Sequence, residues 1–198
     1  MNPFTMRSIV VVGLASGIGW TVLRAESPPP ATSARKAQNA IVHLTQNLKD
    51  DNVSEQARKI VKDHESSDIS AIFRARNGGG LGVGKLTEIG FRDSVQHLIG
   101  SLSSRRNTTE QMFDQYQVDF LHVAQVLQAM AELAPHRATT RIQKDPKLFK
   151  EWLETTSDFK QKTGEFRTAI EEKDPKKVRL AARALNDTCC HCHNLVDF

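Results

Sequence analysis

No stretch of this 198-residue sequence beyond Ser33 alternates apolar and polar residues in the manner of a β-strand. The formal net charge of +4 is a mild surplus, which argues against nucleic acid or any strongly charged molecule as the partner. No carboxylate pair and no combination of a nucleophile with a base can be assigned, so we do not expect an enzyme. These absences favour an all-α protein with a function other than catalysis.

Cysteine is scarce as well, because the chain has only three and all lie within its last ten residues. Cys189, Cys192 and His193 form the pattern Cys-x-x-Cys-His, which is the attachment pattern of a c-type haem. Two thiols form thioethers with the two vinyl groups of one porphyrin, and the imidazole binds the iron. In a helix the three residues lie along one face. We therefore predict one covalent haem c, with thioethers at Cys189 and Cys192 and His193 as the proximal iron ligand.

Two other interpretations of these residues stay open. A structural zinc site usually takes one Cys-x-x-Cys pair and a second pair from a distant element. Since every cysteine is already in the cluster, the second pair would have to be histidines, as in a zinc-binding helical interaction protein. The third interpretation is a tail of free thiols without a ligand. Cys190 and His191 are predicted to point away from the haem, so an exposed Cys190 would be a reactive or dimer-forming thiol.

The N-terminal residues have the pattern of an export segment. Arg7 precedes Ile9–Leu23, an uncharged apolar run of 15 residues that is short for a membrane span and suits a signal peptide. We predict a signal peptide or N-terminal anchor at residues 1–25, a Pro-rich linker at 26–33 and a helical domain at 34–198. Either form places the domain outside the cytoplasmic membrane, in a periplasmic or otherwise exported location that agrees with covalent haem attachment.

Apolar residues recur at helical spacing through the domain. Two series alternate steps of three and four, which is typical of helices that pack in a bundle. They are Phe113, Tyr116, Phe120, Val123, Leu127, Met130 and Ala134, and Phe149, Trp152, Thr156, Phe159, Thr163, Phe166 and Ile170. Asp145-Pro146 and Asp174-Pro175 are predicted to start helices. The helix after Asp174 carries Cys189 and Cys192 on its apolar stripe, so both cysteines are predicted to face the core.

The middle of the chain gives further expectations. Leu86–Leu102 predicts one amphipathic helix, and Thr108-x-x-Gln111 predicts a capping box at the start of the next. Residues 78–85 nearly match a phosphate-binding loop, but Leu86 occupies the position of the magnesium-binding Ser or Thr. The segment before the loop is also helical in pattern. We therefore predict a flexible connection between helices, in which the glycines permit positive φ.

Residues 108–198 resemble the class II c-type cytochromes, the cytochrome c-prime family. The resemblance is carried by Asp174-Pro175, an alanine-rich helix, Asn186-Asp187-Thr188 and the final Cys-x-x-Cys-His. It implies an antiparallel four-helix bundle, here with extra N-terminal helices. It also implies single-electron transfer with a redox partner protein, or alternatively the binding of diatomic gases at an open iron position. Members of the family often form homodimers.

The sixth iron ligand is not specified by this resemblance. Many members carry a methionine on the first bundle helix, but residues 53–76 contain none. His64 lies on the apolar stripe of that predicted helix and is one candidate, although a packed histidine is the commoner case. The alternative is five-coordinate iron with Ile69, Ile72 and Phe73 on the distal side, which we favour.

Overall fold

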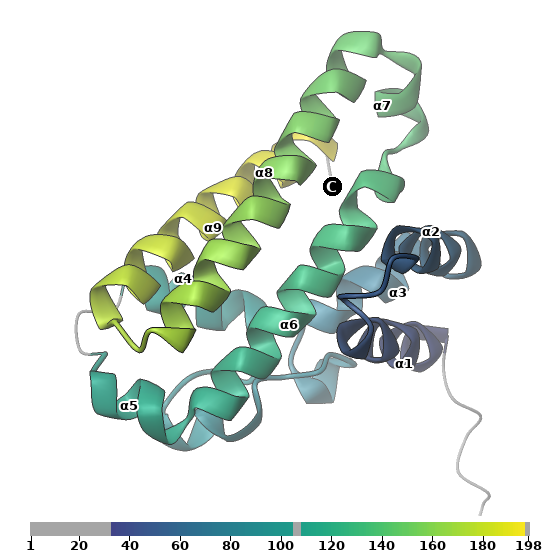
Figure 1. Ribbon diagram of the computed structural model, residues 1–198. Coiled ribbons are helices and arrows are strands. Elements are labelled where there is room, and N and C mark those ends of the chain that lie inside the picture. Colours follow the sequence, from purple (N-terminus) through teal and green to yellow (C-terminus); the bar gives the residue numbers. More distant parts are fainter. Residues whose placement is uncertain (1–32, 105–107, 197–198) are drawn as a thin grey trace, which may run out of the picture. The chain divides into compact units, whose positions relative to one another are not determined.

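In a computed structural model, every regular element of residues 33–104 and 108–196, the parts that the structure describes, is a helix (Figure 1). The all-α prediction is confirmed for these ranges. The predicted signal peptide or anchor at 1–25, and the linker up to residue 32, lie outside them. Among the described helices, none is both long and apolar enough to cross a membrane.

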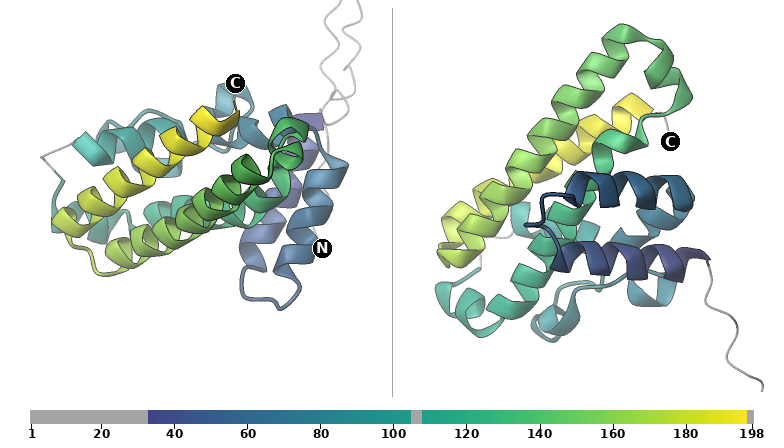
Figure 2. Two further views of the ribbon diagram at one scale, coloured as in Figure 1. Left: turned by 90° about the horizontal axis from the view of Figure 1, so that it is seen from above. Right: turned by 45° about the vertical axis from the view of Figure 1, so that its right-hand side comes forward.

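Three long helices, α6 (Gln117–Leu133), α8 (Pro146–Glu171) and α9 (Pro175–Val196), follow one another along the C-terminal half. α8 packs against both α6 and α9, and the shorter α4 (Val95–Ser104) packs along α9 (Figures 1 and 2). The short connection between α8 and α9 makes these two helices antiparallel neighbours. The helix that carries the three cysteines therefore lies between α8 and α4.

Both predicted Asp-Pro helix starts are confirmed. Asp145 Oδ1 accepts hydrogen bonds from the backbone N–H groups of the second and third residues of α8, at 2.9 and 3.1 Å. Asp174 Oδ1 does the same at the start of α9, at 2.8 and 3.1 Å. In each case the aspartate satisfies N–H groups that have no partner inside the helix, while proline occupies the first helical position.

The N-terminal helices pack on α6. α1 (Ser33–Gln46) and α2 (Val53–Asp63) both contact α6, and α1 also contacts α3 (Ser66–Ser70), which leads directly into the 3₁₀ helix η1 (Ala71–Phe73). Figure 1 shows α1 and α2 on one side of α6 and α8 on the other. The segment expected to form the first bundle helix, residues 53–76, is thus divided into shorter pieces.

Two other predicted helices are also divided. The segment Leu86–Leu102 forms a 3₁₀ helix η3 (Gly84–Ile89) and then α4, because Gly90 adopts a left-handed φ of 83° that ends the first. The series from Phe113 to Ala134 is divided at Tyr116, between α5 (Glu110–Gln115) and α6. Apolar spacing persists across both breaks because the flanking turns bury their apolar residues in the same core.

The predicted capping box at Thr108 was wrong by one residue. Thr109 is the N-cap of α5, and its hydroxyl accepts a hydrogen bond from Met112 N–H at 3.2 Å. The backbone of Thr109 is extended, with φ −120° and ψ 156°, as an N-cap requires. With two threonines in succession, the pattern did not distinguish which one caps the helix.

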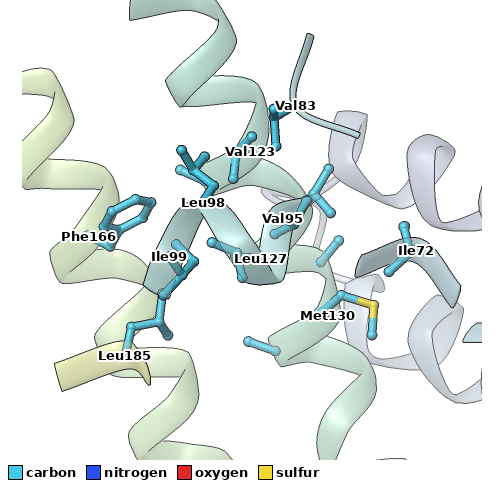
Figure 3. Packing of buried hydrophobic residues seen from close by; sticks show 14 of the residues in the cluster. Ile72, Val83, Val95, Leu98, Ile99, Val123, Leu127, Met130, Phe166 and Leu185 are labelled. Atoms are coloured by element: carbon cyan, nitrogen blue, oxygen red, sulfur yellow. The ribbon is translucent and has the colours of Figure 1, made fainter. Parts of the chain in front are cut away.

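The hydrophobic core is formed where α4, α6, α8 and α9 meet. Figure 3 shows Leu98 and Ile99 of α4 beside Leu127 of α6, Phe166 of α8 and Leu185 of α9, and all five are buried. These side chains belong to one continuous interior, which we call the main cluster and which also includes buried residues of α1, α2, α3 and α5.

The backbone of the glycine-rich loop at residues 78–85 donates hydrogen bonds to aspartate side chains of the same chain. Asp93 Oδ1 accepts a hydrogen bond from Val83 N–H at 3.0 Å, and Asp93 Oδ2 pairs with the Arg76 guanidinium at 2.8 Å. Asp119 Oδ1 accepts from Lys85 N–H at 3.0 Å. The two carboxylates thus accept hydrogen bonds from backbone N–H groups that a phosphate-binding loop would direct at its ligand. The closeness of Asp93 also explains Gly82, where a Cβ atom would lie 2.2 Å from Asp93 Oδ1.

Gly82→Ala is expected to lower the free energy of unfolding by about 1–3 kcal/mol, because the residue has φ +68° and the added Cβ displaces Asp93. Urea unfolding of the variant and the parent measures the difference. Gly100→Ala is the matched control. Gly100 lies inside α4, and apart from its neighbours in that helix no atom lies within 4 Å of an added Cβ, so the substitution should raise stability by about 0.5–1 kcal/mol. Equal effects at the two glycines would contradict the described loop.

Candidate functional site at the C-terminal helix

The buried face of α9 leads directly to the cysteine pair. Val178, Ala182 and Leu185 are buried on this face, and Cys189 and Cys192 continue it in half-buried positions. Cys189 also packs against the main cluster. The two cysteines therefore face the core, as the spacing along the helix predicted.

Cys190 and His191 lie on the outer side of α9, as predicted, and both are exposed. His191 Nε2 lies 3.6 Å from Glu151 Oε1 on the neighbouring α8. The three cysteines are all free thiols in this structure, so Cys190 remains chemically available at the surface.

His193 follows Cys189 by one helical turn and is exposed. The helix continues to Val196, and Arg141 Nη2 donates a hydrogen bond to the carbonyl of Leu195 at 2.8 Å. This contact satisfies a carbonyl group in the last turn of α9, where carbonyl groups lack a partner within the helix. Cys189, Cys192 and His193 are consequently all held within regular helix.

A hydrogen bond between α8 and α9 lies one residue before Cys189. The hydroxyl of Thr188 donates to Asp158 Oδ2 at 2.7 Å, and it also lies 3.1 Å from the carbonyl of Ala184. Thr188 is buried, so this contact satisfies its hydroxyl while joining the two helices. It fixes the position of α9 immediately before the cysteine pair.

Burial strongly affects the two core-facing thiols. It raises the pKa of Cys189 to about 12, with smaller contributions from Cys192 and Cys190. It also raises the pKa of Cys192, although the nearby positive charge of Arg137 acts in the opposite direction. The surroundings of both side chains thus favour the neutral thiol over the thiolate.

Arg137 is a half-buried cation that joins the 3₁₀ helix η4 (Ala134–Arg137) to α3. It lies at the end of η4, and its Nη2 donates to the backbone carbonyl of Ser66 at 3.2 Å and to the hydroxyls of Ser66 and Ser70, each at 2.7 Å. Its Nε is buried without a hydrogen-bond partner. Burial lowers the pKa of Arg137, and Cys192 lies close enough to oppose that shift.

Arg137 was not among the residues predicted from the sequence. Its segment follows Pro135 and had no periodic pattern or motif that pointed to a site. Its partners Ser66 and Ser70 lie 71 and 67 residues earlier in the chain. Only the tertiary approach of α3 to η4 brings them together.

The residues predicted for the distal side of the haem, Ile69, Ile72 and Phe73, all lie in or against the main cluster. Ile69 and Ile72 are fully buried in the main cluster, and Phe73 is half-buried against it. α3 is joined to η4 by the hydrogen bonds of Arg137, and η1 contacts α4, which in turn packs along α9.

His64 does not lie where the sequence predicted. α2 ends at Asp63, and His64 is the residue after it, with an extended backbone at φ −133° and ψ 145°. Its N–H still bonds to the carbonyl of Ile60, and its side chain is half-buried. The prediction of His64 on the apolar stripe of a continuing helix was therefore wrong, because the chain leaves the helix at that residue.

Comparisons with protein-family models, with curated proteins and with solved structures find no match to this chain.

Proposed function

We propose that this chain is an exported monohaem c-type cytochrome that transfers single electrons with a redox partner protein. The observation that carries the proposal is the arrangement on α9, where Cys189 and Cys192 face the core and His193 follows one turn beyond Cys189. These are the residue types and the spacing that two thioethers and one iron ligand require.

The surroundings of the cysteine pair suit a porphyrin. A haem is a large apolar group, and Cys189 lies against the main cluster, in which α4 contributes Leu98, Ile99 and Leu102. Covalent attachment would consume both buried thiols. When bound, the haem supplies an iron that alternates between the ferric and ferrous states.

The residues of the chain would perform the remaining tasks. His193 would bind the iron, and the apolar residues of the main cluster would exclude water from one side of the porphyrin. Electrons would pass through an exposed porphyrin edge, so no substrate pocket is needed. The same packing supports an antiparallel four-helix arrangement of α4, α6, α8 and α9, with α1, α2 and α3 as the additional N-terminal helices.

Binding of a diatomic gas is a second candidate function. It is favoured by the buried apolar pair Ile69 and Ile72, and by the absence of methionine from residues 53–76. Zinc binding has less support. Within residues 33–104 and 108–196, no group of three or more His, Cys, Asp or Glu residues is arranged to hold a metal ion.

The proposal is tested on protein produced in a host with a c-type haem maturation system. We expect a haem that survives acid-acetone extraction, a pyridine haemochrome spectrum of a porphyrin with both vinyl groups saturated, and a haem-bearing C-terminal peptide in mass spectrometry. Colourless protein, despite correct export and maturation, would overturn the proposal.

Carbon monoxide then distinguishes an open iron from a ligated one. Rapid binding to the reduced protein indicates an open position, which gas binding requires. If the parent does not bind carbon monoxide but His64→Ala does, His64 is the sixth ligand.

A further inference from the structure

We propose that a group of exposed basic residues around the start of α8 is the docking surface for an acidic redox partner protein. The group consists of Arg141 and Lys144 of α7 (Thr140–Lys144) and Lys147 and Lys150 of α8, and we call it the basic end. The inference rests on the proposed function, because it names the class of partner with which the haem would exchange electrons.

Positive charge is concentrated in this part of the chain. Residues 141–150 contain four basic side chains and one acidic side chain, although the formal net charge of all 198 residues is only +4. All four basic residues are exposed. The small net charge of the whole chain therefore does not exclude an acidic partner at this surface.

Nearby carboxylates leave much of this charge uncompensated. Asp145, the acidic residue of the segment, is directed at the backbone N–H groups that begin α8. Lys150 pairs with Glu154 at 3.7 Å, but both side chains are well exposed, and such pairs are weak. Among the ion pairs within residues 33–104 and 108–196, none includes Lys144 or Lys147. These two ammonium groups are thus available to an external anion.

The C-terminal end of α9 meets the basic end directly. Nη2 of Arg141 donates to the carbonyl of Leu195 at 2.8 Å, and Leu195 follows His193 by two residues. Figures 1 and 2 show α7 and the beginning of α8 at the end of the structure where α9 ends. The basic end is therefore adjacent to the residue proposed as the iron ligand.

A groove between α8 and α9 provides a second connection to the motif. Lys147 and Lys150 line this groove from α8, and Thr188 and His191, on either side of Cys189, line it from α9. Four carboxylate residues also line the groove. An acidic partner is consequently attracted to the basic end and not into the groove itself.

Two exposed apolar side chains lie among the basic residues of α8. Phe149 is 37% exposed and Leu153 is 42% exposed, and they are one helical turn apart. Protein–protein interfaces combine an apolar centre with a polar or charged rim, which this surface provides. An anionic membrane would match the same chemistry, but it would cover the surface through which a redox partner must approach the end of α9.

Opposite charges would act on the encounter between the two proteins. They raise the association rate, and the effect weakens as salt is added. Electron transfer slows steeply with distance, so a partner held at the end of α9 would react faster than one held elsewhere. One electron passes from the reduced partner to the ferric haem, and no bond of the chain forms or breaks.

The experiment measures electron transfer by stopped flow, with an acidic flavodoxin in its hydroquinone form as the probe. The flavodoxin gives one electron to the ferric protein and becomes the semiquinone. Lys147→Glu reverses one charge of the basic end, and the double variant Lys144→Glu, Lys147→Glu reverses two. Lys176→Glu is the matched control, because Lys176 also follows a proline that begins a helix and is also exposed. It lies about 20 Å along α9 from Cys189.

At an ionic strength of about 0.1 M, charges more than about 10 Å apart are largely screened. Under these conditions the double variant is expected to react with flavodoxin about tenfold more slowly than the parent, and Lys147→Glu to lie between the two. Lys176→Glu should keep the parental rate. Added salt should bring the rates of the parent and the double variant together, because it screens the attraction that only the parent has.

A small cationic reductant, hexaammineruthenium(II), gives the complementary measurement. Charge reversal at the basic end should speed its reaction with the ferric protein, whereas a damaged haem site would slow both reductants. Association is measured without electron transfer as well, by NMR of the labelled protein. Oxidised flavodoxin should shift the backbone amide signals of residues 141–153 in the parent but not in the double variant.

Parental flavodoxin rates in the double variant, or an equal loss of rate in Lys176→Glu, would overturn the inference. Binding to vesicles of anionic phospholipid that requires Lys144 and Lys147, together with parental flavodoxin rates, would assign the surface to a membrane instead. Both lysines are exposed, so their replacement leaves the core intact. A parent without covalent haem would refute the proposed function, while the amide shifts would still test the docking surface, so the two failures are distinguishable.

Discussion

The double variant Cys189→Ala, Cys192→Ala is expected to lose all covalently bound haem, whereas Cys190→Ala keeps the parental amount. The two removed thiols are those on the core-facing side of α9, and no other thiol of the chain lies on that side. Without them the vinyl groups have no sulfur with which to form a thioether. The measurement is the ratio of haem absorbance to protein after acid-acetone extraction, together with the mass of the intact chain.

Cys190→Ala is a close control because it removes the same type of side chain from the intervening position of the motif. Cys190 is exposed, so its loss should neither open a cavity nor remove an attachment point. Single variants at Cys189 or Cys192 should each retain one thioether. Haem that survives extraction in the double variant, or haem that disappears in Cys190→Ala, would contradict the assignment of the two attachment sites.

Phe120→Ala is expected to lower the free energy of unfolding by about 3–5 kcal/mol. Phe120 is fully buried, and its ring lies between two other aromatic rings. Its centroid is 4.9 Å from that of Phe113 and 6.1 Å from that of Phe91, the second pair in an edge-to-face arrangement. Truncation therefore leaves a cavity and removes contacts to α5 and to the loop before α4. Denaturant unfolding monitored by circular dichroism measures the loss.

Val118→Ala provides the comparison for Phe120→Ala. Val118 lies two residues earlier on α6 and is 81% exposed, so its truncation should change stability by about 0.5 kcal/mol or less. A similar effect of both substitutions would show that α6 does not bury the face described here.

The sequence predicted the long helices well because their signals are local. The apolar steps of three and four on α6 and α8, and the Asp-Pro starts at Asp145 and Asp174, each involve residues within a few turns of one another. The helix breaks were harder to predict. Gly90 and Tyr116 interrupt series whose apolar spacing continues on both sides, so periodicity alone did not reveal them.

The candidate site likewise contains residues that the local sequence predicted and residues that it did not. Cys189, Cys192 and His193 were identified from the sequence because the motif is contiguous, and their orientation followed from helix geometry. The contacts of Arg137 were not predicted, because its partners Ser66 and Ser70 lie 71 and 67 residues earlier in the chain. His64 was misplaced because nothing in the local pattern indicated that α2 ends at Asp63.

The hydrogen bond between Thr188 and Asp158 bears on the rotational phase of α9 as well as on its separation from α8. Successive residues are about 100° apart around a helix axis, so a rotation by one residue would bring Cys190 to the interior in place of Cys189. Such a rotation would also expose the buried side chains of Val178, Ala182 and Leu185, so the apolar contacts of α9 oppose it. A short hydrogen bond has a preferred direction, so the Thr188 hydroxyl reinforces the phase in which Cys189, and not Cys190, faces inward.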